Sequence, residues 1–123
     1  WVQQVSFSPL LVALCIKPGR PASDAIIAGE VFTINVVGEH NKKYLKHFWS
    51  GYDPEKSPFE ELEYTDHNGS ISLNESMSTI TCKMTNTISP GDHNIIIAEV
   101  ISSNINEENT KPMVHIRKSG LDY

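Results

Sequence analysis

Alternating apolar and polar positions are clearest in the segment from Ser78 to Ile88. One face of this segment carries Ile80, Cys82, Met84 and Ile88, and the other carries Thr79, Thr81, Lys83, Thr85 and Thr87. Alternation with a period of two predicts a half-buried β-strand. An apolar run of mostly β-branched residues follows from Ile95 to Val100, and it predicts a second strand that is covered on both faces.

The segment Ser89-Pro90-Gly91-Asp92-His93 joins these two predicted strands. Proline presets φ for a turn, glycine permits a positive φ, and aspartate can accept a hydrogen bond from the nearby backbone. The turn therefore places His93 at the mouth of a sheet. From the residues alone, the simplest interpretation of this histidine is a solvated imidazole at a hairpin corner.

Further strands and two short helices are predicted along the rest of the chain. The strands are Trp1–Phe7, Leu10–Ile16, Val31–Val37, Ile71–Leu73 and Met113–Arg117, and the helices are Asp24–Ala28 and Asn41–Trp49. Ser23 is expected to cap the first helix and Gly29 to end it. The apolar side of the second helix is expected to consist of Tyr44, Leu45, Phe48 and Trp49, while its lysines face water.

Polar segments separate these elements. Residues 50–58 and 102–111 are predicted to be loops, and Asp66-His67-Asn68-Gly69 is a strong turn signal. Phe59, Leu62 and Tyr64 are expected to return toward the core. Because strands dominate and both helices are short, the predicted fold class is mainly β, an antiparallel barrel that is closed or partly closed.

Size and composition favour one globular domain. The chain has 123 residues, 39% of them hydrophobic, and a formal net charge of −5. That charge argues against a general nucleic-acid or acidic-membrane binder, and no apolar run is long enough to span a bilayer. Cys15 and Cys82 both lie in apolar runs and are interpreted as small core residues, with a disulfide or a two-cysteine metal site as the alternative. The chain opens on Trp1 with no secretory signal, so we expect a cytoplasmic protein and a piece of a longer polypeptide.

Common catalytic and metal-binding motifs are missing from the sequence. The histidines at 40, 47, 67, 93 and 115 do not form the pairs that put two ligands on one helix face or hairpin, so no metal site is predicted. No serine lies in a Gly-x-Ser-x-Gly elbow, and no glycine-rich dinucleotide motif is present.

A local basic spot remains, formed by Lys17 and Arg20 just before the predicted helix start at Ser23. Backbone N–H groups at a helix N-terminus together with a guanidinium form a good site for a phosphate dianion. The alternative, from the residues alone, is an ordinary polar loop.

Several segments together resemble a known family. They are Trp1-Val2-Gln3-Gln4-Val5-Ser6-Phe7-Ser8-Pro9, the basic loop that ends at Arg20, Glu30-Val31-Phe32-Thr33-Ile34-Asn35-Val36, Cys82, and Gly91-Asp92-His93. This order resembles the flavin reductase-like FMN-binding split barrels. The ending Val114-His115-Ile116-Arg117-Lys118-Ser119-Gly120 with Tyr123 resembles the carboxy-terminal flavin reductase domain of cyanobacterial flavodiiron (diflavin) proteins.

The resemblance implies a split-barrel homodimer that binds FMN at or near the subunit interface. It implies that His93 is the catalytic residue, beside the flavin where a nicotinamide would stack. The implied cofactor-binding residues are Trp1, Val2, Gln3, Gln4, Lys17, Arg20, Ser23 and Asn35. The first four hold the isoalloxazine edge and the basic loop holds the phosphate. Alternation along a strand allows only one of Gln3 and Gln4 to face the flavin.

The implied function is that of an NAD(P)H:flavin oxidoreductase. Hydride would pass from NADH or NADPH to FMN, and electrons would continue to free flavin or to another redox domain of the same polypeptide. The alternative is an FMN-binding electron-transfer module without nicotinamide turnover of its own, and a third interpretation is a dimerisation scaffold that binds no flavin. The chain departs from the family at Ala22, where many relatives have threonine or serine, and it lacks the family's first strand.

Overall fold

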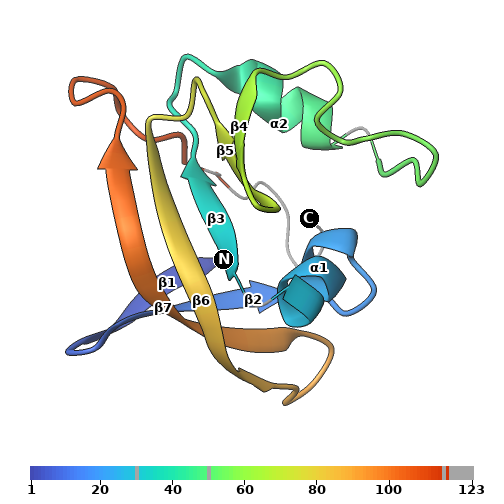
Figure 1. Cartoon of the computed structure of the whole chain (residues 1–123), viewed down its shortest axis with the longest axis vertical. Coiled ribbons are helices and arrows are strands. Elements are labelled where there is room, and N and C mark those ends of the chain that lie inside the picture. The colour runs from blue at the N-terminus through green and yellow to red at the C-terminus, as the bar shows by residue number, and fades with distance from the viewer. Residues whose placement is uncertain (30, 50, 115, 117–123) are drawn as a thin grey trace.

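The structure is a computed structural model, and it describes residues 1–29, 31–49, 51–114 and 116. Two sheets and two helices make up this part of the chain (Figure 1). The elements in order are β1 (Val2–Phe7), β2 (Leu10–Ile16), α1 (Pro21–Gly29), β3 (Val31–Val36), α2 (Lys42–Trp49), β4 (Tyr64–His67), β5 (Ser70–Leu73), β6 (Ser78–Ile88) and β7 (Asn94–Ile105).

All strand pairs are antiparallel. The large sheet has the order β1-β2-β7-β6-β3, and β4 pairs with β5 in a separate hairpin. Figure 1 shows the large sheet curling strongly, with α1 beside β2 and α2 near the top of the view beside the β4–β5 hairpin. The mainly β antiparallel fold with two short helices is therefore confirmed, and its curvature is consistent with a split barrel.

The central strand pair agrees with the sequence pattern at β6 and extends beyond it at β7. β6 covers Ser78–Ile88, as predicted, but β7 continues to Ile105, so the predicted loop is wrong for residues 102–105. The reason is pairing: Ser78 to Thr81 lie opposite Ser102 to Ile105. Backbone hydrogen bonds to a long neighbouring strand make these polar residues extended, although their side chains give no hydrophobic signal.

The core lies between the large sheet and α1. Its buried apolar residues are Val12, Leu14, Ile26, Phe32, Cys82, Ile96 and Ala98. Cys82 is fully buried, and burial raises its pKa to about 11, whereas Cys15 is half-buried. Both are free thiols, so the disulfide alternative is wrong.

The first helix begins earlier than predicted. α1 starts at Pro21, a residue whose fixed φ suits the first helical position, and the Asp24 N–H donates to the Arg20 carbonyl at 3.1 Å. Ser23 is therefore inside the helix rather than at its cap, and its side chain is buried. The capping role expected for Ser23 is wrong for this reason.

The β4–β5 hairpin is held against β3 by two polar side chains. Its turn has positive φ at Asn68 and Gly69, which agrees with the predicted turn signal. Asn35 donates from Nδ2 to the Ile71 carbonyl at 3.0 Å and accepts from the Leu73 N–H at 2.8 Å. Thr33 and Ser70 share a hydroxyl hydrogen bond beside it.

The apolar side predicted for α2 is confirmed, but most of it is exposed. Tyr44, Leu45, Phe48 and Trp49 lie on one side of the helix. Tyr44 is 2% exposed, whereas Leu45, Phe48 and Trp49 are exposed. These three residues line an apolar cleft of about 320 Å³ together with Phe59, which packs edge-on against Phe48. Among the described residues, α2 is covered on this side only by the β4–β5 hairpin and by the polar segment between α2 and β4. The helix is therefore only partly buried.

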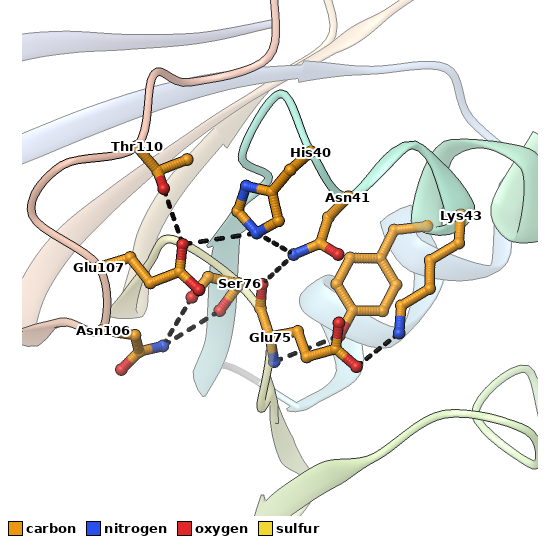
Figure 2. A network of polar contacts seen from close by, with 9 residues as sticks. His40, Asn41, Lys43, Glu75, Ser76, Asn106, Glu107 and Thr110 are labelled. Atoms are coloured by element: carbon orange, nitrogen blue, oxygen red, sulfur yellow. Dashed lines mark hydrogen bonds and ion pairs between the residues drawn. The ribbon is translucent and has the colours of Figure 1, made fainter.

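A polar network fixes the N-terminal end of α2 to the loop before β6 and to the loop after β7 (Figure 2). The Asn41 amide donates to the Glu75 carbonyl at 2.7 Å and bonds to His40 Nε2 at 2.8 Å. The Tyr44 hydroxyl accepts the Glu75 N–H at 3.2 Å. The other members are Lys43, Ser76, Asn106, Glu107 and Thr110. No described buried side-chain nitrogen or oxygen lacks a partner.

The predicted final strand, Met113–Arg117, does not form among its described residues. The chain there makes an isolated bridge between Pro112 and Gly38, and the Met113 N–H donates to the Val37 carbonyl at 2.8 Å. His115 and Arg117 lie outside the described residues, as does the segment Lys118–Gly120 with Tyr123 that contributed to the family resemblance.

Candidate functional site

Strand register brings Trp1 and His93 to the same end of the large sheet. The Cys15 N–H donates to the Trp1 carbonyl at 3.0 Å, so β1 begins where β2 ends. The last residue of β2, Ile16, pairs with Asn94, the first residue of β7. His93 precedes Asn94 directly, and so it flanks the end of β2 on the side opposite to Trp1.

Residues that pair across an antiparallel ladder have side chains on the same face of the sheet. Val2 and Gln4 pair with Leu14 and Val12, which are buried in the core. Gln3 pairs with Ala13 and therefore lies on the opposite face. Alternation along β1 and β7 places Trp1 and His93 on that same outer face. Of the two glutamines, Gln3 is the one on the histidine side of the sheet.

The imidazole of His93 is held by an aromatic neighbour and a carboxylate. The Trp1 and His93 ring centroids are 5.5 Å apart with a 35° angle between the planes. His93 Nδ1 lies 3.1 Å from Asp92 Oδ1, and this hydrogen bond lowers the pKa of Asp92, with the histidine charge as the next cause. An Nδ1–H that donates to Asp92 leaves Nε2 as the ring nitrogen that is not committed to this contact.

The predicted cationic loop lies directly after β2. The Arg20 N–H donates to the Lys17 carbonyl at 3.3 Å, and Gly19 has φ +76°, so residues 17–20 form a tight turn that leads into α1. Lys17 and Arg20 are both exposed. Lys17 also lowers the pKa of Asp92 through its charge, which places these two opposite charges near one another.

Charged groups around this loop affect how it would bind an anion. The charge of Lys17 acts only weakly on Asp92, and the first turn of α1 also carries Asp24, whose carboxylate would repel a phosphate bound there. The N–H groups of Ala22 and Ser23 belong to the first turn of the helix, where no intrahelical carbonyl is available to them. A phosphate at this point would have one guanidinium and two backbone donors as its main ligands.

Ser23 connects the helix to the histidine turn rather than facing solvent. Its hydroxyl is 0% exposed and lies 3.5 Å from Asn94 Nδ2. Asn94 Oδ1 in turn accepts from the Ser89 hydroxyl at 2.8 Å. The prediction from sequence misses Ser89 and Asn94. The one available signal is a polar residue at the start of an otherwise apolar strand.

Asn35, which the resemblance places among the cofactor-binding residues, is not near this end of the sheet. It pairs with Thr79, which in turn pairs with Asn104 at the far end of β7. The nitrogen and the oxygen of its side-chain amide both form hydrogen bonds with the backbone of β5. Within one chain, Asn35 is therefore a structural residue of the hairpin.

The described residues contain no group of three or more histidine, cysteine or acidic side chains that could hold a metal ion. Neither α1 nor α2 has the length and hydropathy needed to cross a bilayer.

The fold and the site define a small antiparallel barrel domain with a cationic loop and a histidine turn at one end of its sheet. The sequence profile described as "Flavin reductase like domain" matches residues 1–120, and the chain belongs to this family. The family predicted from the sequence is therefore confirmed.

Relatives in sequence and in structure agree with this assignment. The chain is 33% identical to diflavin flavoprotein A 1 and 30% identical to diflavin flavoprotein A 6, both of Nostoc sp., over its whole length. It spans 22% of each of these proteins. The solved flavin reductase HpaC, complexed with NADP+, has a TM-score of 0.81 at 26% identity, with 96% of this chain and 74% of that one covered. The NADH:FAD oxidoreductase SgcE6 of Streptomyces globisporus has a TM-score of 0.82 at 22% identity, covering 91% and 68%, which shows a shared fold.

Proposed function

We propose that this chain is an FMN-binding flavin reductase domain that takes hydride from NADH or NADPH. The observation that carries the proposal is the convergence of the Trp1–His93 pair and the Arg20 loop at one end of the sheet. The family assignment and the likeness to HpaC support flavin as the cofactor class. FMN when bound supplies the hydride acceptor, while the protein supplies binding, orientation and electrostatics.

The residues present fit a flavin mononucleotide. Arg20 and the first-turn N–H groups of α1 would hold the phosphate, with Lys17 as a weaker contributor. Gln3 is on the outer face with His93, and its amide can both donate to and accept from the pyrimidine edge of an isoalloxazine. Trp1 is exposed beside it and would give apolar contact for the ring, whereas the side chain of Val2 is on the core-facing side of β1. Gln4 has its side chain on the core-facing side and would contribute through its backbone.

His93 would orient the nicotinamide. Its side chain is 18% exposed, and contact with Trp1 together with the Asp92 hydrogen bond limits its ring rotation. Nε2 could then bond to the carboxamide of the nicotinamide and hold C4 over the flavin. This contact would stabilise the transition state of hydride transfer more than the bound reactants, because charge redistributes between the two rings during the transfer.

A homodimer is the proposed assembly. Large apolar side chains are exposed on the edge strand β1 and around α2, and they include Trp1, Val2, Val5, Phe7, Phe48 and Trp49. Exposed apolar area of this extent usually marks an interface, and a two-fold axis would cover the same surface on both copies. A second copy would also complete a flavin site at the edge of β1. Light scattering that gave a monomer mass with FMN tightly bound would contradict this assembly.

The electron acceptor is proposed to be free flavin or another redox centre of the same polypeptide. The second possibility follows from the relatives, which are named diflavin proteins and are several times longer than this chain. The same observation favours the alternative function, an electron-transfer module without nicotinamide turnover. We place the protein in the cytoplasm, because free thiols at Cys15 and Cys82 suit a reducing compartment.

Two measurements, made one after the other, test the proposal. FMN is first titrated into the protein, and quenching of flavin fluorescence at a defined stoichiometry is expected; a protein that leaves FMN unquenched would be a scaffold without flavin. The loaded protein is then mixed with NADH or NADPH in a stopped-flow instrument. Bleaching of the flavin band at turnover speed supports the reductase. Bleaching only after another reduced protein is added supports the electron-transfer alternative.

A further inference from the structure

Asn94 lies at the junction of the three segments that form the proposed site. It begins β7, it follows His93 directly, and its backbone pairs with Ile16 at the end of β2. Its side chain is on the inner face of the sheet, beneath the first turn of α1, and the residue is only 9% exposed. A polar amide at this depth must find partners to offset its lost hydration.

The partners of Asn94 come from both halves of the site. Oδ1 accepts from the Ser89 hydroxyl at 2.8 Å, which closes the turn that carries His93. Nδ2 lies 3.5 Å from the Ser23 hydroxyl, which is fully buried in the first turn of α1 and follows Arg20 by three residues. The chain Ser89–Asn94–Ser23 is thus a short polar link from the histidine turn to the phosphate loop.

We propose that Asn94 is a positioning residue that fixes the position of the phosphate loop relative to the His93 turn. This inference rests on the proposed function, because it assigns the two ends of the link to phosphate binding and nicotinamide orientation. The Asn94–Ser23 half of the link is inside the protein, where a hydrogen bond is stronger than at the surface and an unpaired partner is more costly. Ser23 is buried and Ser89 is exposed, and Asn94 itself is 9% exposed, so the residue acts through these two neighbours.

The geometry explains why an amide serves here better than an apolar residue. Ser89 and Ser23 approach Asn94 from different elements, and an amide presents an acceptor to one and a donor to the other. Leucine has the same branched heavy-atom skeleton, although it is larger, and it has neither a donor nor an acceptor. It would keep the core filled while leaving both serine hydroxyls without this partner, so the helix and the turn could shift independently.

The test compares Asn94→Leu with two other variants of the same chain. Asn94→Thr places one hydroxyl at the site, which can donate and accept, and threonine suits a strand, so it should restore part of the effect. Asn104→Leu makes the same chemical change on the same strand at an exposed position outside the site. FMN and riboflavin affinities, the rate of flavin reduction by NADH or NADPH, and amide hydrogen exchange without ligand are measured for each.

Asn94→Leu is expected to weaken FMN about fivefold to tenfold, the scale of one net hydrogen bond, and riboflavin by less than about twofold. The reduction rate at saturating nicotinamide should fall as well, because the His93 turn is no longer fixed. Exchange should accelerate in the first turn of α1 and in residues 89–93 together. Asn94→Thr should recover part of each effect, and Asn104→Leu should match the parent.

Three results would overturn the inference. They are an Asn94→Leu protein with parental FMN affinity and rate, equal losses of FMN and riboflavin, or accelerated exchange in only one of the two segments. Failure of the proposed function gives a different result, since the parent itself would then bind no FMN. In that case the exchange measurement still decides whether Asn94 couples the two segments.

Discussion

The indole of Trp1 lies against the imidazole of His93, with ring centroids 5.5 Å apart. These residues are far apart in sequence, directly before β1 and directly before β7, and β2 is the strand that lies between those two strands. Trp1 is 69% exposed, so it covers one side of the histidine and presents its other surface outward. This pair marks the position at which two flat rings, a flavin and a nicotinamide, would stack in the proposed site.

His93→Gln is expected to slow flavin reduction by NADH or NADPH about tenfold or more, because glutamine cannot keep the ring contact with Trp1 or the same bond to a carboxamide. FMN affinity should stay within about threefold of the parent, since the phosphate is held elsewhere. Stopped-flow bleaching and FMN titration measure the two quantities. His67→Gln, in the exposed β4–β5 hairpin, is the matched control. Parental reduction rates in His93→Gln would remove the histidine from the proposed mechanism.

Arg20→Ala is expected to weaken FMN by about ten- to a hundredfold, the scale of a charge-assisted and bidentate contact of about 1.5–3 kcal/mol. Riboflavin, which has no phosphate, should bind the variant and the parent about equally. Lys17→Ala should act more weakly, because an ammonium has no fork. Fluorescence titration with both ligands gives the answer. An FMN affinity within about twofold of the parent would place the phosphate site elsewhere.

Asp92→Asn is expected to lower stability at neutral pH and to have no effect in strong acid. The hydrogen bond from His93 lowers the pKa of Asp92 in the folded protein. The contribution is therefore present above the unfolded pKa of about 4 and is lost as the pH falls through the lower folded value. Urea unfolding of parent and variant from pH 7 to pH 2 measures the difference. A difference that grew toward acid would contradict the assigned direction, and Glu108→Gln, at an exposed position, controls for net charge.

Asn35→Leu is expected to destabilise the fold by about 2–4 kcal/mol, because two hydrogen bonds to the β5 backbone are lost together. FMN affinity, measured well below the unfolding transition, should remain parental if Asn35 serves only the hairpin. Denaturant unfolding and FMN titration separate the two effects. A folded variant with weakened FMN would instead place Asn35 in the cofactor site, as the family resemblance predicts, and would then require a contribution from a second copy of the chain.

Tyr44→Phe is expected to cost about 1–2 kcal/mol of unfolding free energy. The Tyr44 hydroxyl is buried and accepts the Glu75 N–H, and burial raises the pKa of this phenol. Phenylalanine fills the same space and leaves that N–H without its acceptor. Thermal or urea unfolding measures the loss. Tyr52→Phe is the control because Tyr52 is exposed, and equal stability of the two variants would show that the bond contributes nothing.

The sequence determined the strands whose own residues carry the pattern. β6 appears from Ser78 to Ile88 as predicted, and the Asn68–Gly69 turn has the positive φ values that its residues favour. The cationic loop and the His93 turn were also predicted, because proline, glycine and charge act locally. The family followed from such local segments in their order along the chain.

Tertiary structure decided what depends on neighbours. β7 extends through Ser102–Ile105 because β6 offers it a partner, and Ser23 is buried because α1 begins at Pro21 and packs on Asn94. Asn35 belongs to the hairpin at the far end of the sheet because of strand register. A local pattern states which residues favour a strand, a turn or a helix. It does not state which strands pair or which face a helix covers, since these depend on contacts between residues far apart in sequence.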